Sequence, residues 1–68
     1  MAAEIITYEG RVWDVDAQTW ETFDRPARCE VIETARGIPG VRDHLRVRLA
    51  DWPKEPHVYL IFDLEETT

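Results

Sequence analysis

The sequence predicts a mainly β fold: a small antiparallel barrel or strongly curled sheet of four to five strands, with room for one short helix. Three observations lead to this prediction. Most segments alternate apolar and polar residues with the period of a strand, these segments are rich in β-branched and aromatic residues, and their connections are too short for parallel crossovers. With 68 residues and no repeat or linker, we expect one domain over residues 1–68.

The first expected strand covers residues 4–15 and is rich in Ile, Thr, Tyr, Val and Trp. Gly10 interrupts it, which indicates a bend or a bulge at the glycine. The apolar residues occupy both faces, with Ile6, Tyr8 and Val12 on one and Ile5, Trp13 and Val15 largely on the other. Such a strand is central in a sheet, or it curls so that each half faces the core.

A turn is expected next, in a group of small and polar residues: Asp14, Asp16, Ala17 and Gln18. Residues 19–23 then form either a short returning strand, which we favour, or one helical turn capped by Asp16. Pro26 and the two residues before it should break the chain, because proline has no N–H for a sheet ladder. A one-sided strand is expected over residues 27–34, where Ala27, Cys29 and Val31 alternate with Arg28 and Glu30.

Residues 37–40 predict a loop, and a clean alternation follows it, with Leu45, Val47 and Leu49 on one side and His44, Arg46 and Arg48 on the other. A helix is the rival interpretation of residues 41–52, since Val41, Leu45, Leu49 and Trp52 share a helical spacing. It would leave Val47 facing water, so we favour a strand. A stiff connection with two prolines then leads to a last strand over residues 57–65, with Val58, Leu60, Phe62 and Leu64 on one face and Tyr59 and Ile61 on the other.

Charge and cysteine content limit the compartment and the partners. Fourteen acidic residues against eight basic ones give a net charge of −6, which disfavours duplex DNA and anionic membranes, because both reward a basic surface. A single cysteine cannot form an intramolecular disulfide, and small secreted domains depend on several. There is no signal-peptide pattern and no apolar run of membrane-spanning length. We therefore expect an intracellular, cytoplasmic protein with no membrane association.

Few residues suggest catalysis. His44 beside Asp43, with His57 further along, is the only grouping that resembles a metal or acid/base site, and it lacks the three or four converging ligands that metals need. We interpret both histidines as surface residues at strand starts. Cys29 lies on an apolar strand face and is expected in the core, where a thiol is a poor nucleophile. No glycine-rich phosphate loop is present, so we predict no enzyme activity, no metal and no cofactor.

Binding features are more informative. Trp20 and Trp52 adjoin predicted turns and lie next to acidic residues. Each ring is either partly exposed, as in an interface hot spot, or part of the core, where it closes one end of the barrel. His44, Arg46 and Arg48 form a basic stripe, which either binds an anionic partner or pairs with carboxylates across strands. We name these five residues as candidate partner-binding residues.

The resulting hypothesis is a non-catalytic, acidic protein-interaction module that binds another protein, or itself as a homo-oligomer. One version is a regulator or inhibitor of a nucleic-acid-handling protein, since an acidic protein can occupy a basic surface. The alternative is a small barrel that binds single-stranded nucleic acid through Arg46, Arg48 and aromatic faces such as Tyr8 or Trp13. SH3-like and OB-like barrels are architectural analogies only, and architecture does not transfer function.

Overall fold

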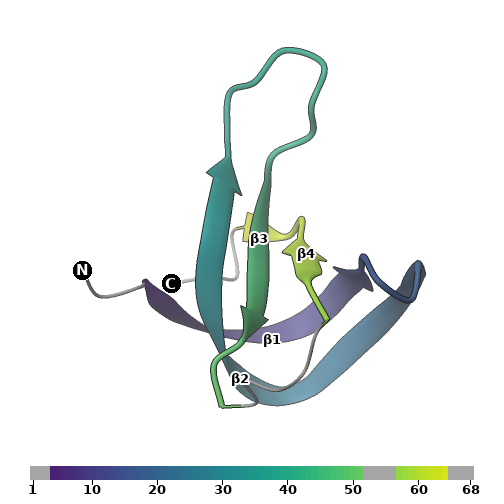
Figure 1. Ribbon diagram of the computed structural model, residues 1–68, viewed down its shortest axis with the longest axis vertical. Coiled ribbons are helices and arrows are strands. Elements are labelled where there is room, and N and C mark those ends of the chain that lie inside the picture. Colours follow the sequence, from purple (N-terminus) through teal and green to yellow (C-terminus); the bar gives the residue numbers. More distant parts are fainter. Residues whose placement is uncertain (1–3, 52–56, 65–68) are drawn as a thin grey trace.

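Alternating apolar side chains close the sheet into a four-stranded antiparallel barrel (Figure 1). The computed structural model describes residues 4–51 and 57–64, and its strands are β1 (Ile5–Asp14), β2 (Thr19–Ala35), β3 (His44–Leu49) and β4 (Tyr59–Ile61). Neighbours in the chain pair with one another, and β1 pairs with β4 to close the barrel. The predicted small β-barrel is confirmed, and the described residues contain almost no helix.

A bulge and a turn shape the β1–β2 hairpin. The register shifts between Tyr8 and Gly10, and Gly10 has a φ of 134°, which an L side chain rarely adopts. The predicted bulge at the glycine is therefore confirmed. The predicted turn is also present, since residues 15–18 form it and the Gln18 N–H donates to the Asp14 carbonyl at 2.8 Å. Residues 19–23 leave this turn as a strand, not as a helical turn.

The prediction that the chain breaks around Pro26 is wrong. β2 runs through it for 17 residues, as the long bent ribbon of Figure 1 shows. Opposite it, Tyr8 pairs with Ala27 while Gly10 pairs with Phe23, so residues 24–26 bulge out of the ladder. A bulged position needs no ladder hydrogen bond, and for that reason it accommodates proline without ending the strand.

Residues 44–49 form a strand, as favoured over a helix, and Leu45 and Val47 are buried while Arg46 and Arg48 are exposed. The last strand is shorter than predicted, because only Tyr59–Ile61 pair as β4 and Glu65 lies outside the described residues. Its inward face carries Tyr59 and Ile61, and the four residues expected on the other face are only partly buried. β1 and β4 share just two paired positions, so this seam is the shortest in the barrel.

The core lies inside the barrel, and the part of the chain that the structure describes contributes seven buried residues to it: Tyr8, Val12, Cys29, Leu45, Val47, Tyr59 and Ile61. Phe23 joins it by edge-on ring contacts with Tyr8 and Tyr59, at centroid distances of 6.5 and 5.2 Å. Cys29 is fully buried, as predicted, and burial raises the pKa of its thiol to about 11. This thiol is therefore protonated at neutral pH and serves as a core side chain.

Within residues 4–51 and 57–64, no helix has the length and apolar character that crossing a membrane would require.

Candidate functional site

A row of side chains crosses the barrel on its outer surface. Trp13 pairs with Trp20 on β2 and with Leu60 on β4, and Leu60 in turn pairs with Arg46 on β3. Directly paired residues on antiparallel strands point to the same side of the sheet. The row therefore places one exposed tryptophan, Trp20, and one exposed arginine, Arg46, on the same outer face.

At one end of this row lies an open depression of about 430 Å³. Trp20 is 44% exposed there, and its ring contacts Trp13 edge-on at 5.2 Å and Phe62 at 6.0 Å. The Arg11 guanidinium lies 4.3 Å over Trp20, and the Arg42 guanidinium lies 4.9 Å over Phe62. We call Arg11, Trp20, Arg42 and Phe62 the aromatic–arginine patch.

The patch is locally basic although the chain as a whole is acidic. Among residues 4–51 and 57–64, Asp63 is the single acidic residue that lines the depression, against the two arginines. His44 borders the patch, since its ring lies 5.7 Å from Phe62 and its Nδ1 lies 2.8 Å from the Arg42 carbonyl. A guanidinium that stacks on a ring keeps its N–H groups at its edge, where they can bind a carboxylate or phosphate in a bidentate way.

The structure brings together some of the five predicted partner-binding residues. Trp20 and His44 meet at the patch, and Arg46 lies in the cross-strand row that leads to it. Arg48 is farther away and opposes Glu30, while Arg46 also opposes Glu33, in the cross-strand arrangement considered from the sequence. Trp52 lies outside the described residues.

Three members of the patch were missed: Arg11, Arg42 and Phe62. The sequence carried a signal for Arg11, because strand alternation places it on the same face as Trp13. Alternation also placed Phe62 on the face of Leu60, whereas Arg42 comes from the loop between β2 and β3, where no periodicity places a side chain.

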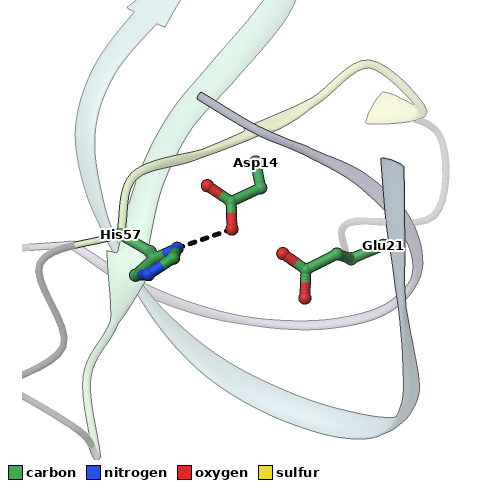
Figure 2. Close-up of side chains that lie close together, drawn as sticks. All are labelled: Asp14, Glu21 and His57. Carbon is green, nitrogen blue, oxygen red and sulfur yellow. Dashed lines mark hydrogen bonds and ion pairs between the residues drawn. The ribbon is translucent and has the colours of Figure 1, made fainter. Parts of the chain in front are cut away.

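A second group of side chains lies where β1 ends (Figure 2). Potential ligand atoms of Asp14, Glu21 and His57 all lie within 4.8 Å of one another. Asp14 Oδ2 lies 2.6 Å from His57 Nδ1, while Asp14 Oδ1 accepts hydrogen bonds from the Asp16 and Ala17 N–H groups at 3.0 Å. Asp14 is fully buried and the His57 side chain is 32% exposed. The grouping of His57 with His44 and Asp43 that the sequence suggested is absent, since His44 lies at the aromatic–arginine patch.

Hydrogen bonding keeps the buried Asp14 ionised. Burial raises the pKa of its carboxyl, but hydrogen bonds with Glu21, with the Ala17 N–H and with His57, together with the charge on His57, outweigh burial. The pKa is therefore lowered from 3.8 to about 2. At neutral pH Asp14 is a fixed negative charge inside the end of the barrel.

This pKa shift predicts an acid-sensitive contribution to stability. Because the folded-state pKa of Asp14 is lowered, its contribution is complete above pH 3.8 and is lost as the pH falls toward about 2. The free energy of unfolding is measured with urea at several pH values, with a chelator present so that metal ions do not affect the result. It should be higher for wild type than for Asp14→Asn near neutral pH, and this difference should shrink between pH 4 and about 2. A difference that stays constant over that range would contradict the prediction.

The two groups can do different chemistry. The aromatic–arginine patch can hold an anionic group against a ring, and the Asp14 group can hold a proton or a cation.

Comparison of the chain with models of protein families, with curated proteins and with solved structures finds no match to any of them.

Proposed function

We propose that this protein is a non-catalytic protein-interaction module that binds an acidic segment of a partner protein through the aromatic–arginine patch. The observation that carries the proposal is Trp20, a large ring left 44% exposed between Arg11 and Phe62 in an open depression. Trp and Arg are the residues that most often dominate the binding energy of protein interfaces.

Charge determines the class of segment. Of the lining residues that the structure describes, two are arginines, Arg11 and Arg42, and one is a carboxylate, Asp63, which supports an anionic occupant. Their stacked guanidinium groups present N–H edges to a partner's carboxylates, while an apolar side chain of the partner covers the exposed part of Trp20. The occupant that fits is therefore a segment that alternates acidic and apolar residues.

Single-stranded nucleic acid is the second candidate, and the cross-strand row favours it by adding Arg46 to Trp13 and Trp20. Two observations make it the weaker one. Tyr8, one of the rings expected to stack on bases, is 1% exposed and cannot contact a base. At the patch, Arg11 and Arg42 already lie over the faces of Trp20 and Phe62 where a base would stack.

The narrower hypothesis, a regulator of a nucleic-acid-handling protein, depends on the net charge of −6, and the patch adds no support for it.

Binding to a second copy of the chain is a separate outcome. It would appear as a dimer mass in solution, and substitution of Arg42 would abolish it if the patch were the contact.

The proposal is tested with a fluorescently labelled synthetic peptide of alternating Glu and Leu, measured by anisotropy. Wild type should bind it at low salt and release it as salt rises, because exposed charges are screened. Arg42→Ala should weaken binding about tenfold, the scale of one interface hot spot, whereas Arg48→Ala is the matched control and should leave it unchanged. Equal affinity of the two variants, or no binding, would overturn the proposal.

A labelled single-stranded oligonucleotide is titrated in parallel at about 50 mM salt, where phosphate contacts are strong. Tighter binding of the oligonucleotide than of the peptide would replace the proposed function with the second candidate.

A further inference from the structure

A compact set of three ligand atoms lies apart from the aromatic–arginine patch. Asp14 comes from the end of β1, Glu21 from the start of β2 and His57 from the residues just before β4. The three side chains point toward one another in Figure 2. We infer that Asp14, Glu21 and His57 form a binding site for one divalent transition-metal ion of the Zn²⁺ type. This site is independent of the proposed function.

The spacing suits a metal ion. Ligand atoms that bind Zn²⁺ at about 2.0 to 2.2 Å in a tetrahedron are roughly 3.3 Å apart. The potential ligand atoms here lie within 4.8 Å of one another, with Asp14 Oδ2 and His57 Nδ1 at 2.6 Å. Glu21 is exposed and His57 partly exposed, so both side chains have room to turn, and a bound ion would replace the hydrogen bond between Asp14 and His57.

The surroundings of Asp14 fit a ligand role. Its Oδ1 is fixed by the Asp16 and Ala17 N–H groups, which turns Oδ2 toward His57. Such supporting hydrogen bonds orient the ligands of metal sites in proteins. The His57 ring also stacks on Tyr59, with the ring planes inclined by 23°, and this contact holds the imidazole in place.

Electrostatics also favour a cation at this position. Asp14 is fully buried, and the Glu21 carboxyl is within hydrogen-bonding range of it. Two neighbouring carboxyl groups favour a divalent cation between them, because the cation offsets the repulsion of like charges. Metal ligands bind in their deprotonated form, so metal binding releases protons.

The donor set selects the kind of metal. One imidazole nitrogen with two carboxylate oxygens suits Zn²⁺ and neighbouring divalent transition metals, whereas Mg²⁺ and Ca²⁺ prefer oxygen ligands alone. Three protein ligands would leave the fourth position of a tetrahedron open to water or another ligand. The Cys29 thiol does not compete for the metal, since it is fully buried in the core.

Isothermal titration of the EDTA-treated, dialysed protein with ZnCl₂ tests the inference. We expect one site per chain, proton release that varies with the buffer, and a thermal unfolding midpoint that rises with Zn²⁺ but not with Mg²⁺. Long-range ¹H–¹⁵N spectra should show a change at the His57 imidazole and none at His44. Absence of a stoichiometric site in wild type would overturn the inference.

Matched variants locate the site. Glu21→Gln changes an exposed side chain and should weaken Zn²⁺ binding about tenfold or more, as should His57→Gln. His44→Gln is the histidine control and Glu33→Gln the glutamate control, and both should bind as wild type does. Unchanged affinity in Glu21→Gln, or loss of binding in His44→Gln, would place the metal elsewhere and overturn the assignment.

Discussion

Replacement of Asp14 by alanine is expected to lower the free energy of unfolding by about 3 kcal/mol, because it removes a buried, ionised side chain with several hydrogen-bond partners. Its carboxylate accepts from the Asp16 and Ala17 N–H groups and bonds to His57, which lies 43 positions away in the chain. A domain of this size has about 3 to 5 kcal/mol of stability in total, so the variant should keep only about 0 to 2 kcal/mol and be marginally stable at room temperature.

The size of this effect follows from where Asp14 lies. The β1–β4 seam has two paired positions, and the residues next to it extend the contact: the Val15 N–H donates to the Val58 carbonyl at 2.9 Å, and the Val58 N–H donates to Asp16 Oδ2 at 2.8 Å. Asp14 and His57 add a side-chain bond to the same seam. Loss of Asp14 therefore weakens the closure of the whole barrel.

Urea unfolding followed by circular dichroism measures the effect. Asp51→Ala is the matched control, because Asp51 pairs with Arg28 at 2.7 Å but both side chains are about 60% exposed. Exposed ion pairs contribute about 0 to 1 kcal/mol, so this variant should remain close to wild type. Similar losses in the two variants would show that the buried position of Asp14 has no special role.

The sequence predicted the architecture because local patterns were strong. Alternation in residues 44–49 correctly indicated a strand, and Gly10 correctly indicated a bulge. Pro26 misled the prediction, since proline is excluded from a ladder but not from a bulge, and a bulge depends on the partner strand. The extent of β4 was also misjudged, because apolar residues beyond Ile61 pack without strand pairing.

The sites were less predictable than the fold. Trp20 and His44 were named from local context, and they do lie at the aromatic–arginine patch. The Asp14 group was missed, although alternation with Val12 already placed Asp14 on the inward face. Its partner His57 could not be identified, because only the closure of β4 against β1 brings residues 43 positions apart into contact.

Tyr8 is expected to give the largest loss of stability among single substitutions. Tyr8→Ala should cost about 3 to 5 kcal/mol, since it removes a 1% exposed ring from the centre of the barrel, where Phe23 packs edge-on against it. Tyr8→Phe keeps the ring and removes only the hydroxyl, which donates to the Arg11 carbonyl at 2.9 Å, so it should cost about 1 kcal/mol.

The two variants together separate packing from hydrogen bonding in the core. Urea unfolding of both, with Trp20→Ala as a control for loss of a half-exposed ring, gives the comparison. If Tyr8→Phe were as unstable as Tyr8→Ala, the hydroxyl bond across the Gly10 bulge would be what holds the bend of β1, and the ring would contribute little. If instead Tyr8→Phe stays folded while Tyr8→Ala does not, the packing of this ring against Phe23 is what stabilises the core of the barrel.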